Sequence, residues 1–546
     1  MPLIHGLHLN NLRGDVFGGL TAAVVALPLA LAFGVSSGAG PIAGLYGAIF
    51  VGFFAAMFGG TPAQVSGPTG PMTVVMALVF TEYVSRDPES GPLLAFTVVM
   101  LSGLFQIGLG LLRLGKYITM VPFPVISGFM TGIGTIIILL QLGPLLGHPV
   151  ASSALLSFQS IPQLIADPNL TALLFGALTL AIVFFWPKTL ARVVPAPLVA
   201  LILCTLAYMM WFQTDELTVI GTIPSGWPTL KVPLINMDLL QDMLTSAAML
   251  AALGAIDSLL TSLVADNLSK QHHDSDRELI GQGIGNTVAG LFGGLPGAGA
   301  TMRTVVNIRA GGKTPLSGMI HALVLLVLVL GAGPLAEHIP HAVLAGILIK
   351  VGIDIIDWDF LRRLHRAPLF VIFLMGIVLY LTVFVDLITA VLVGVFLANM
   401  YTVKRLSDVQ LNEAKVVSAD DEQLSVRERE LFTQLGNQVL LYCLNGPVSF
   451  GAAKAIQKRL EASGAHDALL LDLSNVPYID VSTAMAIEAM ILEAEEANRH
   501  VFLIGLTPIV EEVLERMKVV QLLGRERIFD DRMMAMQRLV NLKQGG

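Results

Sequence analysis

The fold is decided by two stretches that lie far apart in the chain, Ser66-Gly67-Pro68-Thr69-Gly70-Pro71-Met72-Thr73-Val74-Val75 and Gly297-Ala298-Gly299-Ala300-Thr301-Met302-Arg303-Thr304-Val305-Val306. Each opens an apolar run with small, helix-breaking residues, and this pattern predicts a helix that begins partway through a membrane. The stretches also resemble each other, since Met72-Thr73-Val74-Val75 matches Met302-Arg303-Thr304-Val305-Val306 with one inserted residue. The first turn of a helix has unpaired backbone N–H groups and a partial positive charge. Two such starts that face one point predict a binding site for an anion.

The composition is that of a membrane protein. Of the 546 residues, 54% are hydrophobic and 13% are charged, whereas a soluble domain has about 25% charged residues. The 53 glycines and 28 prolines fit broken membrane helices. Cys204 and Cys443 are the only cysteines and exclude a disulfide framework. A net charge of −8 without a basic tract argues against a nucleic-acid partner. No Walker loop or zinc-ligand spacing is present, so we expect no enzyme and no cofactor.

Apolar runs of spanning length recur from Val16 to Met400 and predict an α-helical polytopic membrane protein. We expect about fourteen segments: 16–34, 41–59, 68–83, 91–111, 120–145, 169–186, 195–212, 239–264, 277–294, 299–310, 315–333, 341–354, 367–385 and 386–402. With residues 1–15 in the cytoplasm, the Lys and Arg residues of the loops fall on the cytoplasmic side, except Arg86 and Lys231. The positive-inside rule predicts this asymmetry.

Fourteen segments divide into two halves of seven. Leu20-Thr21-Ala22-Ala23 in segment one resembles Leu244-Thr245-Ser246-Ala247-Ala248 in segment eight, and segment three resembles segment ten. Because seven is odd, equivalent segments run in opposite directions across the membrane. We therefore expect an inverted repeat within a transport domain of residues 1–403, with repeat one at about 1–213 and repeat two at about 238–403, and a substrate site near the midplane.

The composition changes abruptly after the last apolar run. Residues 404–430 are polar and charged and predict a linker, and residues 431–546 have the pattern of a cytoplasmic α/β domain. Strands at 439–444, 468–473 and 501–506 alternate with helices at 451–462, 482–498 and 508–517. This alternation predicts a parallel sheet with crossover helices.

Two ionisable residues fall inside apolar segments, where charge is expensive and commonly functional. Asp257 and Thr261 lie one helical turn apart in segment eight, and their hard oxygen atoms suit Na⁺. Asp257 alone can instead carry H⁺, or it can simply pair with Arg303. Arg303 in turn offers a planar fork to an oxyanion, or serves only to neutralise Asp257. Thr69, Thr73 and Thr301 offer hydroxyl groups near the two starts, or hydrogen-bond within and between helices.

Glu278, Gln282 and Asn286 recur at every fourth residue and form a polar stripe on segment nine. The stripe either lines a pathway or, as we expect, holds neighbouring backbone and joins the two halves. His272-His273 is expected to be a solvated loop pair.

Several motifs carry a resemblance to a known family. They are Gly18-Gly19-Leu20-Thr21-Ala22-Ala23 with Leu27-Pro28, Gly67-Pro68-Thr69, the Asp257 motif Gly254-Ala255-Ile256-Asp257-Ser258, Glu278-Leu279-Ile280-Gly281-Gln282-Gly283 with Gly285-Asn286, and Arg303 with Asn307 and Ala310-Gly311. With these motifs the chain resembles the SulP transporters, the bacterial branch of the sulfate permease and solute carrier 26 group. Asp472-Leu473-Ser474-Asn475-Val476-Pro477-Tyr478-Ile479-Asp480-Val481-Ser482-Thr483 resembles the signature of STAS domains.

The resemblance implies a core and a gate domain, half-helices at segments three and ten, an elevator-like motion and a homodimer in the inner membrane, with the N-terminus and the STAS domain cytoplasmic. The membrane part is most similar to the cyanobacterial sodium-dependent bicarbonate branch, on Leu29-Ala30-Leu31-Ala32-Phe33-Gly34, Phe96-Thr97-Val98-Val99-Met100, Val264-Ala265-Asp266 and the run from Lys350 to Trp358. That branch implies Na⁺ at Asp257, Thr261, Gly299 and Thr301. It implies the anion at Thr69 and at the backbone of Gly70 and Ala300.

Arg303 departs from that branch, which tends to have a small residue there. A fixed positive charge disfavours a nearby cation, so two alternatives to Na⁺-dependent bicarbonate uptake stay open. They are H⁺-coupled symport of sulfate or a dicarboxylate, and an uncoupled channel or carrier; a sensor that binds without transport is a further class. In the STAS signature, Ser482 is either a phosphorylation site or a helix N-cap.

Overall fold

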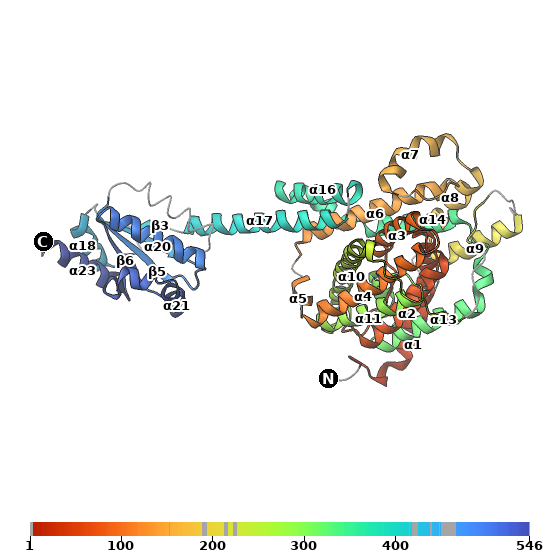
Figure 1. Ribbon diagram of the computed structural model, residues 1–546, viewed down its shortest axis with the longest axis horizontal. Helices are drawn as coiled ribbons and strands as arrows, with labels where there is room; N and C mark the ends of the chain where they lie inside the picture. Colours follow the sequence, from red (N-terminus) through yellow and green to blue (C-terminus); the bar gives the residue numbers. More distant parts are fainter. Residues whose placement is uncertain are drawn as a thin grey trace. The chain divides into compact units, whose positions relative to one another are not determined.

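The computed structural model describes residues 4–544 except 119–120, 152, 188–189, 191–193, 212–216, 222–226, 386, 414, 418–423, 437–438, 447 and 449–465. The chain divides into two compact units, Met1–Val395 and Phe396–Gly546. The first unit is helical apart from one very short pair of strands, and the second contains a sheet between helices (Figure 1).

Each predicted apolar segment corresponds to one helix. The helices are α1 (Leu12–Ser36), α2 (Pro41–Phe58), α3 (Gly70–Arg86), α4 (Gly91–Leu111), α6 (Phe123–Leu145), α8 (Leu170–Phe185), α9 (Ala196–Trp211), α10 (Leu240–Ser269), α11 (Ser275–Leu291), α12 (Thr301–Arg309), α13 (Pro315–Ala336), α14 (His341–Ile355), α16 (Leu369–Phe384) and α17 (Leu387–Glu413). Within the described residues, α1, α2, α4, α6 and α10 are each long and apolar enough to cross a membrane. By contrast, α12 has only 9 residues, as expected of a half-helix.

Three shorter helices among the described residues of the first unit were not predicted. They are α5 (Gly115–Ile118), α7 (Ala154–Ala166) and α15 (Trp358–Arg363). The largest, α7, is amphipathic, is capped by Ser153 and meets α8 at 115°. A search for spanning apolar runs misses a helix of this kind, because its length is below a membrane span and one face is polar.

The helix contacts have the symmetry of an inverted repeat. Helix α1 packs against α12 and α13, and its counterpart α10 packs against α3 and α4. In the same way α2 packs against α13 while α11 packs against α4, and α6 packs against α16 while α14 packs against α8. We call α1–α4 with α10–α13 the core bundle, and α6, α8, α9, α14 and α16 the gate bundle.

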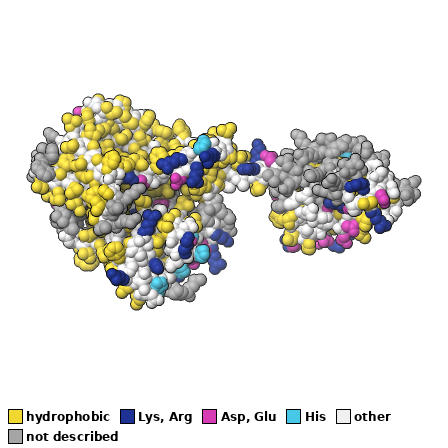
Figure 2. Space-filling view, turned by 180° about the vertical axis from the view of Figure 1, so that it is seen from behind, with side chains coloured by type: hydrophobic (Ala, Val, Ile, Leu, Met, Phe, Trp, Pro, Cys, Tyr) yellow, Lys and Arg dark blue, Asp and Glu magenta, His cyan; other side chains and the backbone are white. Residues whose placement is uncertain are grey.

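Apolar side chains cover much of the first unit (Figure 2). Several of the most exposed belong to the gate bundle, including Leu170, Phe185 and Leu369, which are at least 74% exposed. An apolar surface of this extent is expected where lipid rather than water surrounds the helices.

The second unit has a five-stranded sheet in the order β3 (Lys415–Val417), β4 (Val439–Asn445), β5 (Ala468–Asn475), β6 (His500–Ile504) and β7 (Ile528–Phe529). Strands β4, β5 and β6 are parallel, as predicted. The strand β7, which was not predicted, is parallel to β6, and β3 is antiparallel to β4. Helices α20 (Val481–Glu496), α21 (Pro508–Arg516) and α22 (Val519–Leu523) pack on one face, and α18 (Val426–Leu435) and α23 (Arg532–Gln544) on the other (Figure 1). The helix expected at 451–462 lies outside the described residues.

The stretch expected to be a linker contains regular structure. Helix α17 continues to Glu413, and β3 and α18 lie within residues 404–435. The polar composition of this stretch does not prevent helix formation, because α18 begins with a capping box between Ser425 and Glu428.

A buried ion pair joins the sheet to α23. Asp472, the fifth residue of β5, is 2% exposed and accepts hydrogen bonds from Arg532 Nε, Ser474 N and Ser474 Oγ. Burial disfavours the charged guanidinium, but the hydrogen bond to Asp472 and the nearby negative charges together raise the pKa of Arg532. The ion pair ties β5 to the last helix.

Candidate functional site

Two paired strand fragments bring the halves of the chain together. β1 (Ser66–Gly67) and β2 (Ala298–Gly299) pair antiparallel, with Ser66 opposite Gly299 and Gly67 opposite Ala298. Helix α3 begins three residues after β1, and α12 begins two residues after β2. The prediction that the two half-helix starts lie side by side is therefore confirmed.

Both starts leave backbone N–H groups outside the helical ladder. Thr69 and Ala300 occupy the N-cap positions, and neither helix has a side-chain cap. The first helical bonds are Thr73 N to Thr69 O and Thr304 N to Ala300 O, both 2.9 Å. The preceding N–H groups, including that of Gly70, are thus available to a ligand. Thr73 Oγ1 donates to Thr69 O at 2.7 Å, so its hydroxyl is used within the helix.

Helix α10 contacts both starts through two side chains one turn apart. Asp257 Oδ2 accepts a 2.7 Å hydrogen bond from Thr69 Oγ1. Thr261 Oγ1 donates to Gly299 O at 2.8 Å and lies 2.7 Å from Thr301 Oγ1. The cluster thus holds one carboxylate, three hydroxyls and one carbonyl, an all-oxygen set of the kind that hard cations take.

Burial differs across this cluster. Thr261 is fully buried, and Asp257 and Thr69 are 6% and 8% exposed. Thr301, at the first position of α12, is exposed. The cluster can therefore be reached from the side of α12.

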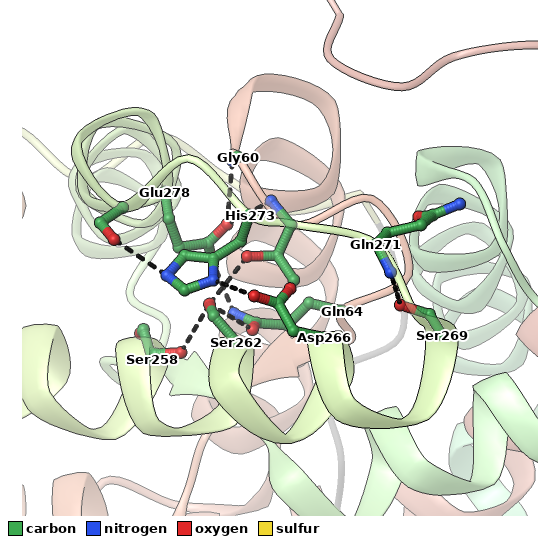
Figure 3. Close-up of polar contacts among 11 residues, drawn as sticks. Gly60, Gln64, Ser258, Ser262, Asp266, Ser269, Gln271, His273 and Glu278 are labelled. Atoms are coloured by element: carbon green, nitrogen blue, oxygen red, sulfur yellow. Dashed lines mark hydrogen bonds and ion pairs between the residues drawn. The ribbon is translucent and has the colours of Figure 1, made fainter.

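Ser258 and Ser262 also belong to the site, although the sequence was not interpreted that way. Ser258 Oγ accepts from Gly299 N at 3.1 Å, and Ser262 Oγ lies 2.7 Å from Thr61 Oγ1. Both project from α10 toward the loops that precede the half-helices (Figure 3). Ser258 and Ser262 are four residues apart and directly follow Asp257 and Thr261 in the sequence. This spacing places them on one helical face and could have predicted their part in the site.

Arg303 binds backbone rather than Asp257. Its Nη2 atom donates to Pro68 O, and a β-carbon placed on Gly67 would lie 2.7 Å from its Nη1 atom. Asp257 and Arg303 are both described, and no ion pair within 4.0 Å joins them. The two side chains therefore form no direct ion pair, and a role of Arg303 in neutralising Asp257 without contact stays a prediction. The guanidinium is 2% exposed and places its charge directly before Thr69.

The polar stripe of α11 holds backbone, as expected. Glu278 Oε2 accepts from the N–H groups of Gly60 and Thr61 at 2.9 Å, and Oε1 accepts from Gln64 Nε2 at 2.7 Å (Figure 3). Asn286 holds the loop before α12, because its side chain accepts a hydrogen bond from Gly297 N and donates one to Gly297 O. One helix thus fixes the segments that lead into both half-helices.

His272-His273 is not a solvated pair. His272 is exposed, but the His273 side chain is only 8% exposed. Its Nδ1 lies 2.7 Å from Asp266 Oδ2, and its Nε2 lies 2.9 Å from Ser275 Oγ (Figure 3). The solvated interpretation is wrong for His273, which joins the end of α10 to the start of α11.

Ser482 is the second residue of α20 and is partly exposed. The N-cap is Asp480, whose Oδ1 accepts from Thr483 N at 2.7 Å. The N-cap interpretation of Ser482 is therefore wrong, and its hydroxyl stands in the first turn of the helix.

A repeated helical unit with two facing half-helices and a buried carboxylate beside them is the architecture of a multi-pass membrane transporter. The chain belongs to the sulfate permease family, whose model matches residues 12–378, and a STAS domain model matches residues 433–534. The protein is an anion transporter and not an enzyme.

Individual relatives agree with this assignment. The chain is 49% identical to "Bicarbonate transporter BicA" of Synechocystis sp., over 98% of this chain and 96% of that protein. The solved transmembrane domain of a cyanobacterial BicA has a TM-score of 0.67 at 53% identity, and it matches 71% of this chain and 100% of that one. The structure of SLC26A9 matches 99% of this chain and 92% of that one with a TM-score of 0.84 at 18% identity, which shows the shared fold.

Proposed function

We propose that the protein takes up bicarbonate together with Na⁺ by secondary active transport. One observation carries the proposal: Asp257 and Thr261, on one face of α10, contact the start of α3 and the start of α12 respectively. A cation in this oxygen cluster would bind beside the N–H groups at the starts of α3 and α12, which receive the anion in this proposal. The name of a relative that is 49% identical along nearly the whole chain supports bicarbonate as the anion.

In this mechanism the half-helix starts bind the anion through the N–H groups after Thr69 and Ala300, and Arg303 adds a fixed positive charge. The cation binds Asp257, Thr261, Thr301 and the carbonyl of Gly299, and its charge offsets that of the anion. The core bundle then carries both ions past the gate bundle in an elevator-like motion.

H⁺-coupled sulfate or dicarboxylate symport is the second candidate. The buried guanidinium of Arg303 favours it, because this permanent charge lies next to Thr69 and disfavours a second cation nearby. In that case Asp257 would carry the proton. An uncoupled carrier would need neither Na⁺ nor H⁺ to transport the anion.

We further propose that the protein is a homodimer in the inner membrane, with the N-terminus and the STAS domain in the cytoplasm. A phosphate on Ser482 would lie in the first turn of α20, where the helix dipole favours negative charge. Ser482 is therefore the candidate regulatory residue.

Uptake of labelled bicarbonate and sulfate into proteoliposomes tests these functions. We expect bicarbonate accumulation that needs an inward Na⁺ gradient. Sulfate accumulation driven by a pH gradient would establish the second candidate, and uptake that ignores both gradients at fixed membrane potential would establish the uncoupled one. Binding without accumulation would refute transport altogether.

A further inference from the structure

Two helices of the gate bundle cross at a pair of glycines. A β-carbon placed on Gly134 of α6 would lie 2.5 Å from the carbonyl oxygen of Gly352, and one placed on Gly352 of α14 would lie 2.8 Å from the carbonyl oxygen of Gly134. The two backbones are therefore in direct contact, and any side chain at either position would separate them. Because α6 and α14 are equivalent in the two repeats, this crossing is symmetric.

Each glycine is followed three residues later by an isoleucine. Ile137 and Ile355 therefore lie about one turn beyond the crossing on their helices. Both side chains converge on one point of the core bundle, since a β-carbon placed on Gly70 would lie 2.8 Å from the Cδ1 atoms of both. Gly70 is the first residue of α3 and supplies one of the free N–H groups of the anion site.

A cavity lies between the core bundle and the gate bundle in the same region of the molecule. Its volume is about 500 Å³, and it lies between α1 and α3 of the core bundle and α6, α7 and α16. Val74 and Ile136 belong to its lining, and each is next to the pair: Val74 is one turn from Gly70, and Ile136 adjoins Ile137. A second void, at Asp257 between α10 and α6, has only about 10 Å³. The isoleucine pair itself lies against the half-helix start at Gly70.

We propose that Ile137 and Ile355 form an apolar selectivity filter that faces Gly70 and restricts the anion site to small anions. The proposal rests on the anion-binding role of the half-helix starts described above. Two branched side chains from the gate bundle limit the width of the site. They also offer no hydrogen bonds, so an anion that carries more oxygen atoms or more charge must give up hydration on this side without replacement.

The experiment measures uptake of bicarbonate and sulfate into proteoliposomes by wild type, Ile137→Ala and Ile355→Ala. We expect the ratio of sulfate to bicarbonate uptake to rise by about tenfold or more in each variant, since loss of several methyl(ene) groups from a pocket changes discrimination by at least that factor. Ile202→Ala is the matched control, because Ile202 belongs to α9 of the gate bundle and is 46% exposed. The proposal is overturned if both variants keep the wild-type ratio, or if Ile202→Ala changes it equally.

A second variant makes the test independent of folding. Gly70→Ala places a methyl group against both isoleucines, so we expect uptake to be lost in a protein that still reaches the membrane. The triple variant Gly70→Ala, Ile137→Ala, Ile355→Ala removes the clash, and its uptake should recover. Uptake that stays absent in the triple variant, or persists in Gly70→Ala alone, contradicts the proposed contact. A wild-type protein that transports neither anion would instead refute the proposed function, so the two failures are distinguishable.

Discussion

Replacement of Asp257 by Asn tests the link between cation and anion most directly. Asn keeps an acceptor oxygen for the Thr69 hydroxyl, which now donates to Asp257 at 2.7 Å, and its volume is nearly unchanged. The half-helix start should therefore stay in place. Only the negative charge is removed from the oxygen cluster, so a loss of function reports charge rather than packing.

The size of the effect follows from burial. Asp257 is 6% exposed, so its charge acts in a medium far less polarisable than water. A cation about 4 Å away gains about 4 kcal/mol at an effective dielectric constant of about 20. Because exposed Thr301 admits water beside the cluster, we take about 2–4 kcal/mol, which corresponds to a 30- to 1,000-fold loss of Na⁺ affinity.

The assay is the Na⁺ concentration that gives half-maximal bicarbonate uptake in proteoliposomes. Asp242→Asn is the matched control, since Asp242 lies at the exposed start of the same helix and forms a surface ion pair with Arg86 that contributes little. We expect Asp257→Asn to raise the Na⁺ requirement at least 30-fold and Asp242→Asn to leave it unchanged. Wild-type Na⁺ dependence in Asp257→Asn would refute the assigned role of the carboxylate.

Three further predictions concern stability. Glu278→Ala removes the 1%-exposed carboxylate that accepts hydrogen bonds from two backbone N–H groups, and it should destabilise the first unit by about 3–5 kcal/mol. A thermal melt in detergent measures this loss of stability, with Glu278→Gln as the milder comparison. An unchanged Tm of Glu278→Ala contradicts the prediction. Asp472→Asn leaves the guanidinium of Arg532 without its charged partner and should destabilise the second unit by about 3 kcal/mol, seen as faster amide exchange in residues 466–544 of the full-length protein but not in the first unit. The hydrogen bond from Ser90 lowers the pKa of Asp87 in the turn between α3 and α4. The ionised Asp87 therefore stabilises this turn at neutral pH, and the stabilisation is lost as the pH falls through the lowered pKa. Amide exchange across residues 87–91 at pH 7 and at low pH should show this loss, and Asp87→Asn should abolish the pH dependence.

The fold could be predicted because its signals are local. Segment lengths follow from the thickness of a bilayer, and a helix that starts in mid-membrane needs small residues and proline at its start. Thr69, Gly70 and Thr301 were found because they sit at these starts. Asp257 was found because an ionisable residue in an apolar segment is conspicuous.

Other parts of the site depend on tertiary contacts that no local pattern encodes. Ser258 and Ser262 are ordinary residues of a membrane helix until the loops before α3 and α12 pack against them. His273 was expected to be solvated because it lies beyond the end of α10 and seven residues from its partner Asp266. Ile137 and Ile355 are 218 positions apart and meet only because Gly134 and Gly352 let their helices touch.

The two charges of repeat two act on adjacent residues of repeat one. Arg303 donates to the carbonyl of Pro68, and Asp257 accepts from the hydroxyl of the next residue, Thr69. Because Arg303 is bound to the Pro68 carbonyl and Asp257 to the Thr69 hydroxyl, the two charged groups do not form an ion pair with each other. A cation that binds Asp257 must compete with the Thr69 hydroxyl, which is then free to turn toward an anion at the Gly70 N–H group. In the proposed mechanism, Thr69 is therefore the residue through which occupancy of one ion site would change the other.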